Sequence, residues 1–198
     1  MIPVFFKALA GQSASRVAAK AVLSVIFVAI AAYFSRGDVA LAIIIIFTGV
    51  TGPAIRLVTM KMNGTYDRIV VSPGLKSTFF LRFAGVWFIA VILPLVPSIA
   101  VVAVIYGSAV IVQAVSGTIL AVSLGSIAGI AARGLSEAHL TALFAATVLI
   151  FLSFIKTPMT FFMPYTAFSS VLGSWSLVNS FILPVIAVIV LVLVAFRL

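Results

Sequence analysis

Six long apolar segments constrain the fold of this chain more than any other feature of its sequence. A helix needs about 20 predominantly apolar residues to cross a bilayer, and inside the bilayer every backbone polar group must be satisfied within the protein. The segments cover residues 17–34, 39–58, 83–105, 109–132, 140–155 and 177–196. Because 65% of the residues are hydrophobic and only 8% are charged, the chain lacks the polar surface of a soluble domain. We therefore predict an all-α integral membrane protein in which residues 1–198 form a single domain of six transmembrane helices.

The basic residues predict the orientation of these helices. The net charge is +9, and the cytoplasmic loops of membrane proteins are enriched in Lys and Arg. With a cytoplasmic N-terminus, ten of the twelve basic residues fall inside, and only Arg36 and Lys156 fall outside. We therefore expect a multi-pass protein of the cell membrane with both termini in the cytoplasm. The same placement makes membrane lipid, rather than nucleic acid, the expected neighbour of the positive charge.

The first sixteen residues differ from a cleavable signal peptide. No basic region precedes their apolar residues, and the apolar run continues past any plausible cleavage point. Ile2, Phe5, Phe6 and Leu9 recur at helical spacing, a pattern typical of an amphipathic helix that lies in the membrane interface. The alternative is a ragged extension of the first span.

Two of the predicted spans carry residues that shape helix packing. Pro94 and Pro97 in the third span each remove a backbone donor, so we expect a kink or a break there. In the fourth span, small residues recur every four positions along one face, which lets another helix approach closely. These helix-packing residues are Gly117, Ala121, Gly125 and Gly129.

The segment between the fifth and sixth predicted spans is too apolar for a free loop and too broken for a full span. We expect a re-entrant outer gate there, because irregular backbone at membrane depth must be buried in protein or line a cavity. The alternative is a belt of aromatic residues that anchors the bundle at the interface. The prolines and aromatic residues of this candidate gate are Pro158, Phe161, Phe162, Pro164, Tyr165 and Trp175.

Residues 60–82 form the only long polar interruption of the apolar chain. Within it, Tyr66, Ile69 and Val70 are spaced i, i+3, i+4, which places them on one stripe of a short helix. A short helix with an apolar stripe and a few charges suits insertion into a groove of a partner protein. The alternative is that the stripe lies on the membrane surface.

No constellation for catalysis or cofactor binding is visible in the sequence. There is no cysteine, His139 is the one histidine, and only three acidic residues are present, so no metal site is predicted. No Gly-x-x-x-x-Gly-Lys-Ser/Thr motif occurs, so the chain is not expected to bind ATP through a P-loop of its own. We therefore predict that the chain itself is not an enzyme and holds no cofactor.

The polar interruption resembles the cytoplasmic segment of ABC transporter type-2 permeases. The residues that carry the resemblance are Gly64-Thr65-Tyr66-Asp67-Arg68-Ile69-Val70-Val71-Ser72-Pro73. In that family a Gly-Thr, a hydrophobe, an acid, a basic residue and further hydrophobes precede a proline, between the second and third of six spans. An interfacial N-terminal helix and a re-entrant segment before the last span also fall in matching places. The chain departs from the pattern at residues 61–63, because the family has acidic residues there and this chain has Lys-Met-Asn.

The resemblance implies a permease subunit of an ABC transporter that exports or flips a hydrophobic or amphiphilic substrate. It implies a cytoplasmic coupling helix near 64–72, on which a separate ABC ATPase subunit docks, and a second permease subunit that is either a copy or a paralogue. ATP and Mg would be bound by the partner ATPase. The docking residues that the resemblance implies are Gly64, Thr65, Tyr66, Asp67, Arg68, Ile69, Val70 and Pro73.

Two other functions stay open at this point. The chain has the size and number of spans of the substrate-binding membrane subunit of an energy-coupling-factor vitamin importer. Ala14 and Ala18 match the small-residue pairs in the first span of that family, although that family does not account for residues 64–73. The other alternative is a membrane assembly protein with no transport role.

Overall fold

The computed structural model describes residues 13–34, 37–66, 76–154 and 185–194. All the regular secondary structure in these ranges is α-helical. The prediction of an all-α chain is therefore confirmed for the described residues. The helices are α2 (Ala14–Tyr33), α3 (Gly37–Met62), α5 (Lys76–Tyr106), α6 (Ala109–Ala131), α7 (Leu135–Phe154) and a C-terminal helix at Val185–Val194.

Four of these helices are long and apolar enough to cross a membrane. They lie at Ser15–Tyr33, Gly37–Met62, Phe79–Tyr106 and Ala109–Ala131, and they match the first four predicted spans. The apolar parts at Leu135–Ile150 and Val185–Val194 are shorter. The chain thus has the apolar helices of a multi-pass membrane protein, and the fifth and sixth spans stay predictions.

The first and fifth predicted spans begin earlier than hydropathy suggested. The Ser13 hydroxyl accepts a hydrogen bond from the Arg16 N–H, 3.4 Å away, so α2 begins at Ala14 rather than at residue 17. The helix α7 begins at Leu135 rather than at residue 140, and Glu137 Oε2 accepts from the Arg133 N–H at 2.8 Å. Both starts lie in polar residues because a side-chain oxygen satisfies a free N–H group at the helix end.

The break expected in the third span is absent. The helix α5 continues through Pro94 and Pro97 to Tyr106. Prolines are tolerated in membrane helices because neighbouring helices and side chains satisfy the freed backbone groups. Beside them, Ser98 Oγ lies 2.8 Å from Ser24 Oγ in a buried hydrogen bond between α5 and α2.

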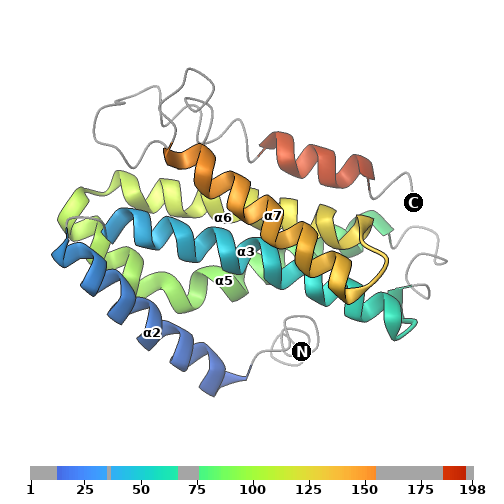
Figure 1. Cartoon of the computed structure of the whole chain (residues 1–198), viewed down its shortest axis with the longest axis horizontal. Helices are drawn as coiled ribbons and strands as arrows, with labels where there is room; N and C mark the ends of the chain where they lie inside the picture. The colour runs from blue at the N-terminus through green and yellow to red at the C-terminus, as the bar shows by residue number, and fades with distance from the viewer. Residues whose placement is uncertain (1–12, 35–36, 67–75, 155–184, 195–198) are drawn as a thin grey trace.

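The helix α3 lies at the centre of the bundle and contacts α2, α5, α6 and α7 (Figure 1). Successive helices run in opposite directions. At one end of the bundle the Gly37 N–H donates to the Tyr106 hydroxyl at 3.3 Å, so the start of α3 adjoins the end of α5. At the other end the Lys61 ammonium donates to the Ala132 carbonyl oxygen at 2.9 Å, so the end of α3 adjoins the end of α6.

The contact between α3 and α6 is made almost directly between backbones. A Cβ atom added to Gly125 would lie 2.3 Å from the Val50 carbonyl oxygen, and one added to Gly129 would lie 2.8 Å from the Ala54 carbonyl oxygen. The small residues of the α6 face are all buried. They are Gly117, Ala121, Gly125 and Gly129.

Candidate functional site

Basic residues gather at one end of the bundle, where α3 ends, α5 begins and a short turn joins α6 to α7 (Figure 1). The described residues of this end include Arg56, Lys61, Arg82 and Arg133. The acidic residue Asp38 lies in the first turn of α3, at the opposite end. We call the first of these the basic end, and the polar interruption of the sequence leaves the bundle there.

The polar interruption begins with a tight turn at Gly64. This residue has φ +65°, a left-handed conformation that glycine adopts without strain, and its N–H donates to the Lys61 carbonyl oxygen at 3.0 Å. Thr65 and Tyr66 then resume helical structure. The coupling helix stays a prediction, because Asp67, Arg68, Ile69, Val70 and Pro73 lie outside the described residues.

The Tyr66 side chain does not lie on a free face of this segment. Only 9% of its surface is exposed, and its ring packs edge-on against Phe80 of α5, with the ring centroids 6.2 Å apart. The prediction that Tyr66 enters a groove of a partner protein therefore needs correction, because this side chain is buried in the core of its own chain. Of the predicted stripe, Ile69 and Val70 remain as the candidate docking residues.

Lys61 connects the start of the polar interruption to the end of α6 by hydrogen bonds. Its ammonium donates to the Ile130 and Ala132 carbonyl oxygens, the latter at 2.9 Å, and it lies 5.4 Å from the centroid of the Tyr66 ring. The last carbonyls of a helix lack partners within the helix, and a cation beside them is favourable. We call Lys61, Tyr66, Phe80 and the end of α6 the Lys61 cluster. It joins three helices, α3, α5 and α6, at the root of the polar interruption.

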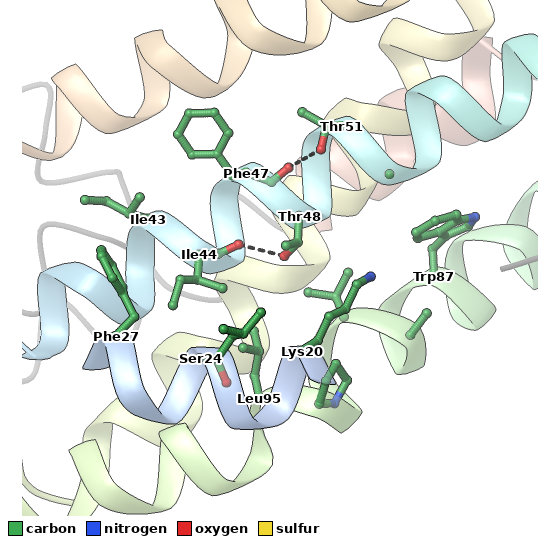
Figure 2. A pocket seen from close by; sticks show the side chains of 15 residues that line it. Lys20, Ser24, Phe27, Ile43, Ile44, Phe47, Thr48, Thr51, Trp87 and Leu95 are labelled. Carbon is green, nitrogen blue, oxygen red and sulfur yellow. Dashed lines mark hydrogen bonds between the residues drawn. The ribbon is translucent and has the colours of Figure 1, made fainter. Parts of the chain in front are cut away.

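Sequence reasoning missed a pocket between α2, α3 and α5, which has a volume of about 530 Å³ (Figure 2). The described residues that line it are apolar apart from a few hydroxyl groups and the charge of Lys20. The signal was present in the sequence, because Lys20 is a charged residue inside an apolar segment, and such residues mark functional sites in membrane proteins. We call this pocket the Lys20 pocket.

Trp87 of α5 forms one wall of the Lys20 pocket. A Cβ atom added to Gly52 of α3 would lie 2.4 Å from Trp87 Cζ3, so the ring lies against the α3 backbone. Trp87 is 6% exposed, and its indole Nε1 has no hydrogen-bond partner within the described part of the chain.

The candidate outer gate and the first twelve residues of the predicted interfacial helix lie outside the part of the chain that the structure describes. The residues Pro158, Phe161, Phe162, Pro164, Tyr165 and Trp175 lie outside the described ranges. Within those ranges, no group of three or more His, Asp or Glu side chains could hold a metal ion.

Comparisons of the chain with protein-family models, with curated proteins and with solved structures found no match.

Proposed function

We propose that this chain is the membrane subunit of an ATP-driven transporter of the ABC type-2 kind, moving a hydrophobic or amphiphilic substrate out of the cell or across the bilayer. A separate ATPase subunit docks on the polar segment that follows Gly64, and a second permease subunit completes the complex. ATP and Mg belong to the ATPase. The chain contributes the membrane path and the element that receives the motion of the ATPase.

The Lys61 cluster is the observation that carries this proposal. A segment that transmits the motion of a partner must be held firmly by the helices that it moves. Lys61 joins the end of α3 to the end of α6, and Tyr66 packs against Phe80 at the start of α5. A displacement of the segment after Tyr66 would therefore act on three helices together rather than on a free loop.

The orientation of the bundle gives the first test. Cysteine variants at Ser108 and Ser136 form a matched pair, because both serines are exposed and the chain has no native cysteine. Ser108 precedes the start of α6, and Ser136 follows its end at the start of α7, so they lie at opposite ends of the bundle. With the basic end in the cytoplasm, a membrane-impermeant maleimide should label Ser108→Cys on intact cells. It should label Ser136→Cys only after the cells are permeabilised. The reverse pattern would place the polar interruption outside the cell and exclude ATPase docking.

Docking of the ATPase gives the second test. The double variant Ile69→Ala with Val70→Ala should release ATPase subunits from the affinity-tagged chain in detergent. Burial of one such side chain contributes about 1.5–3 kcal/mol, so losing much of two should weaken binding by roughly a hundredfold. The measurement is the ATP hydrolysis that co-purifies with the chain, with the ATPase identified by its mass.

Arg68→Ala serves as the matched control for docking, because an ion pair with a solvent-exposed group of the ATPase would contribute only about 0–1 kcal/mol. It should retain most of the ATPase. Size-exclusion chromatography shows whether each variant is intact. Full ATPase retention in the double variant would refute docking at this segment, and tight binding of a vitamin by the chain alone would favour the vitamin-importer alternative.

A further inference from the structure

The Lys20 pocket combines a long apolar surface with one positive charge. Lys20 and Phe27 come from α2, Ile44 and Thr51 from α3, and Leu95 from α5. None of the described residues that line the pocket is acidic. Figure 2 shows the Lys20 side chain extending away from α2 into the pocket. The Lys20 ammonium lies toward one end of the pocket, and Phe27 of the same helix lies toward the other.

Lys20 has no counter-ion within the described residues. No hydrogen bond or ion pair joins it to another described side chain, and the charge that acts on it most directly is that of Arg16, which has the same sign. Lys20 is exposed, in the second turn of the apolar helix α2, where a charged side chain is stabilised by a partner of opposite charge. The pocket therefore favours a ligand that brings a negative charge to Lys20.

The protons that remain free in the lining point to the same ligand chemistry. The Thr48 and Thr51 hydroxyls donate to the Ile44 and Phe47 carbonyl oxygens of their own helix, each at 2.6 Å. The Ser24 hydroxyl is hydrogen-bonded to the Ala21 carbonyl oxygen and to the Ser98 hydroxyl. Among the described lining residues, the accessible donor left over is the Lys20 ammonium. A free cationic donor beside an apolar surface matches an anionic head on a hydrocarbon chain.

We propose that the Lys20 pocket binds an anionic lipid of the surrounding bilayer. The lipid phosphate lies against the Lys20 ammonium, and one acyl chain lies along Phe27, Ile44 and Leu95. A zwitterionic lipid of the same chain length fits the apolar lining but carries its own cation beside the phosphate. The preference for the anionic lipid thus comes from Lys20. This binding requires neither an ATPase nor transport, so it stands or falls independently of the proposed transporter function.

The test is lipid retention by the purified full-length chain, measured by native mass spectrometry. The chain is exchanged into detergent with equal amounts of phosphatidylglycerol and phosphatidylcholine that have identical acyl chains. We expect the wild-type chain to retain phosphatidylglycerol selectively and Lys20→Gln to lose about tenfold in its affinity, as expected for a lost hydrogen bond to a charged group. Lys20→Arg should retain the lipid, and soluble glycerol phosphate should not displace it.

Arg82→Gln is the matched control, because Arg82 is exposed, lies outside the pocket lining and carries the same charge. It should bind phosphatidylglycerol like the wild-type chain. If Lys20→Gln and Arg82→Gln lost the same affinity for phosphatidylglycerol, the effect would come from net charge alone, and the proposal would be overturned. Equal retention of the two lipids by the wild-type chain would also overturn it. So would efficient disulfide formation between two copies of Leu23→Cys, since a second copy would then cover the pocket.

Discussion

Gly125→Ala should destabilise the bundle strongly, although it adds a single methyl group. The new Cβ atom would lie 2.3 Å from the Val50 carbonyl oxygen and 2.8 Å from Val50 Cα. Both are backbone atoms that cannot rotate away, so α3 and α6 must separate. Overpacking of this kind costs about 1–3 kcal/mol and occasionally more, and we expect the upper part of that range. The measurement is the thermal unfolding midpoint of the purified chain in detergent.

Gly85→Ala is the control for this prediction. Gly85 also lies inside a helix, but it is exposed and a Cβ atom there would have no neighbour within 4 Å. Because Ala favours helix over Gly by about 0.8–1 kcal/mol, this variant should melt at the same temperature as the wild-type chain or higher. Equal melting temperatures for Gly125→Ala and Gly85→Ala would show that the helices do not approach as closely as the structure has them.

Lys61→Met should loosen the basic end of the bundle. Met keeps most of the length of the side chain but removes the ammonium that donates to the Ile130 and Ala132 carbonyls. Hydrogen bonds to charged groups contribute about 1.5–3 kcal/mol, so we expect a loss of about 2–3 kcal/mol. Hydrogen–deuterium exchange should speed up at residues 64–66 as well as in the turn after α6, because the Lys61 cluster joins them.

Two further variants separate the cluster from a general charge effect. Lys61→Arg keeps the cation beside the end of α6 and should restore part of the protection, although the planar guanidinium fits the site differently. Arg82→Met removes an exposed cation of the same end and should leave exchange unchanged. If exchange in Lys61→Met matched that of the wild-type chain, Lys61 would not hold the polar segment, and the proposed path of coupling would lose its structural basis.

The long helices follow from the sequence because lipid leaves the backbone few choices. A segment of about 20 apolar residues must satisfy its own hydrogen bonds, so the first four apolar runs predict α2, α3, α5 and α6. Hydropathy does not detect helix turns that begin in polar residues. It therefore placed the start of α7 five residues late, where Glu137 satisfies the Arg133 N–H.

The spacing of small residues identified the packing face of α6 but not the helix that packs on it. Any helix with a small-residue patch could have approached Gly125. Only the tertiary structure places Val50 and Ala54 of α3 there. The apolar stripe of the polar interruption had the same limit. Its spacing shows that Tyr66 needs an apolar surface, and the structure supplies that surface from Phe80 of the same chain rather than from a partner.

The sequence by itself determined that the chain is helical, apolar along most of its length, and basic between its second and third long helices. The tertiary structure decided what the charged residues face. Lys20 sits near the start of an apolar run, where its long side chain could have snorkelled to the membrane interface. The packing of α2 against α3 and α5 places this exposed side chain in the lining of a pocket. The direction of a side chain relative to its neighbours depends on how helices pack, and helix packing brings together residues far apart in the sequence.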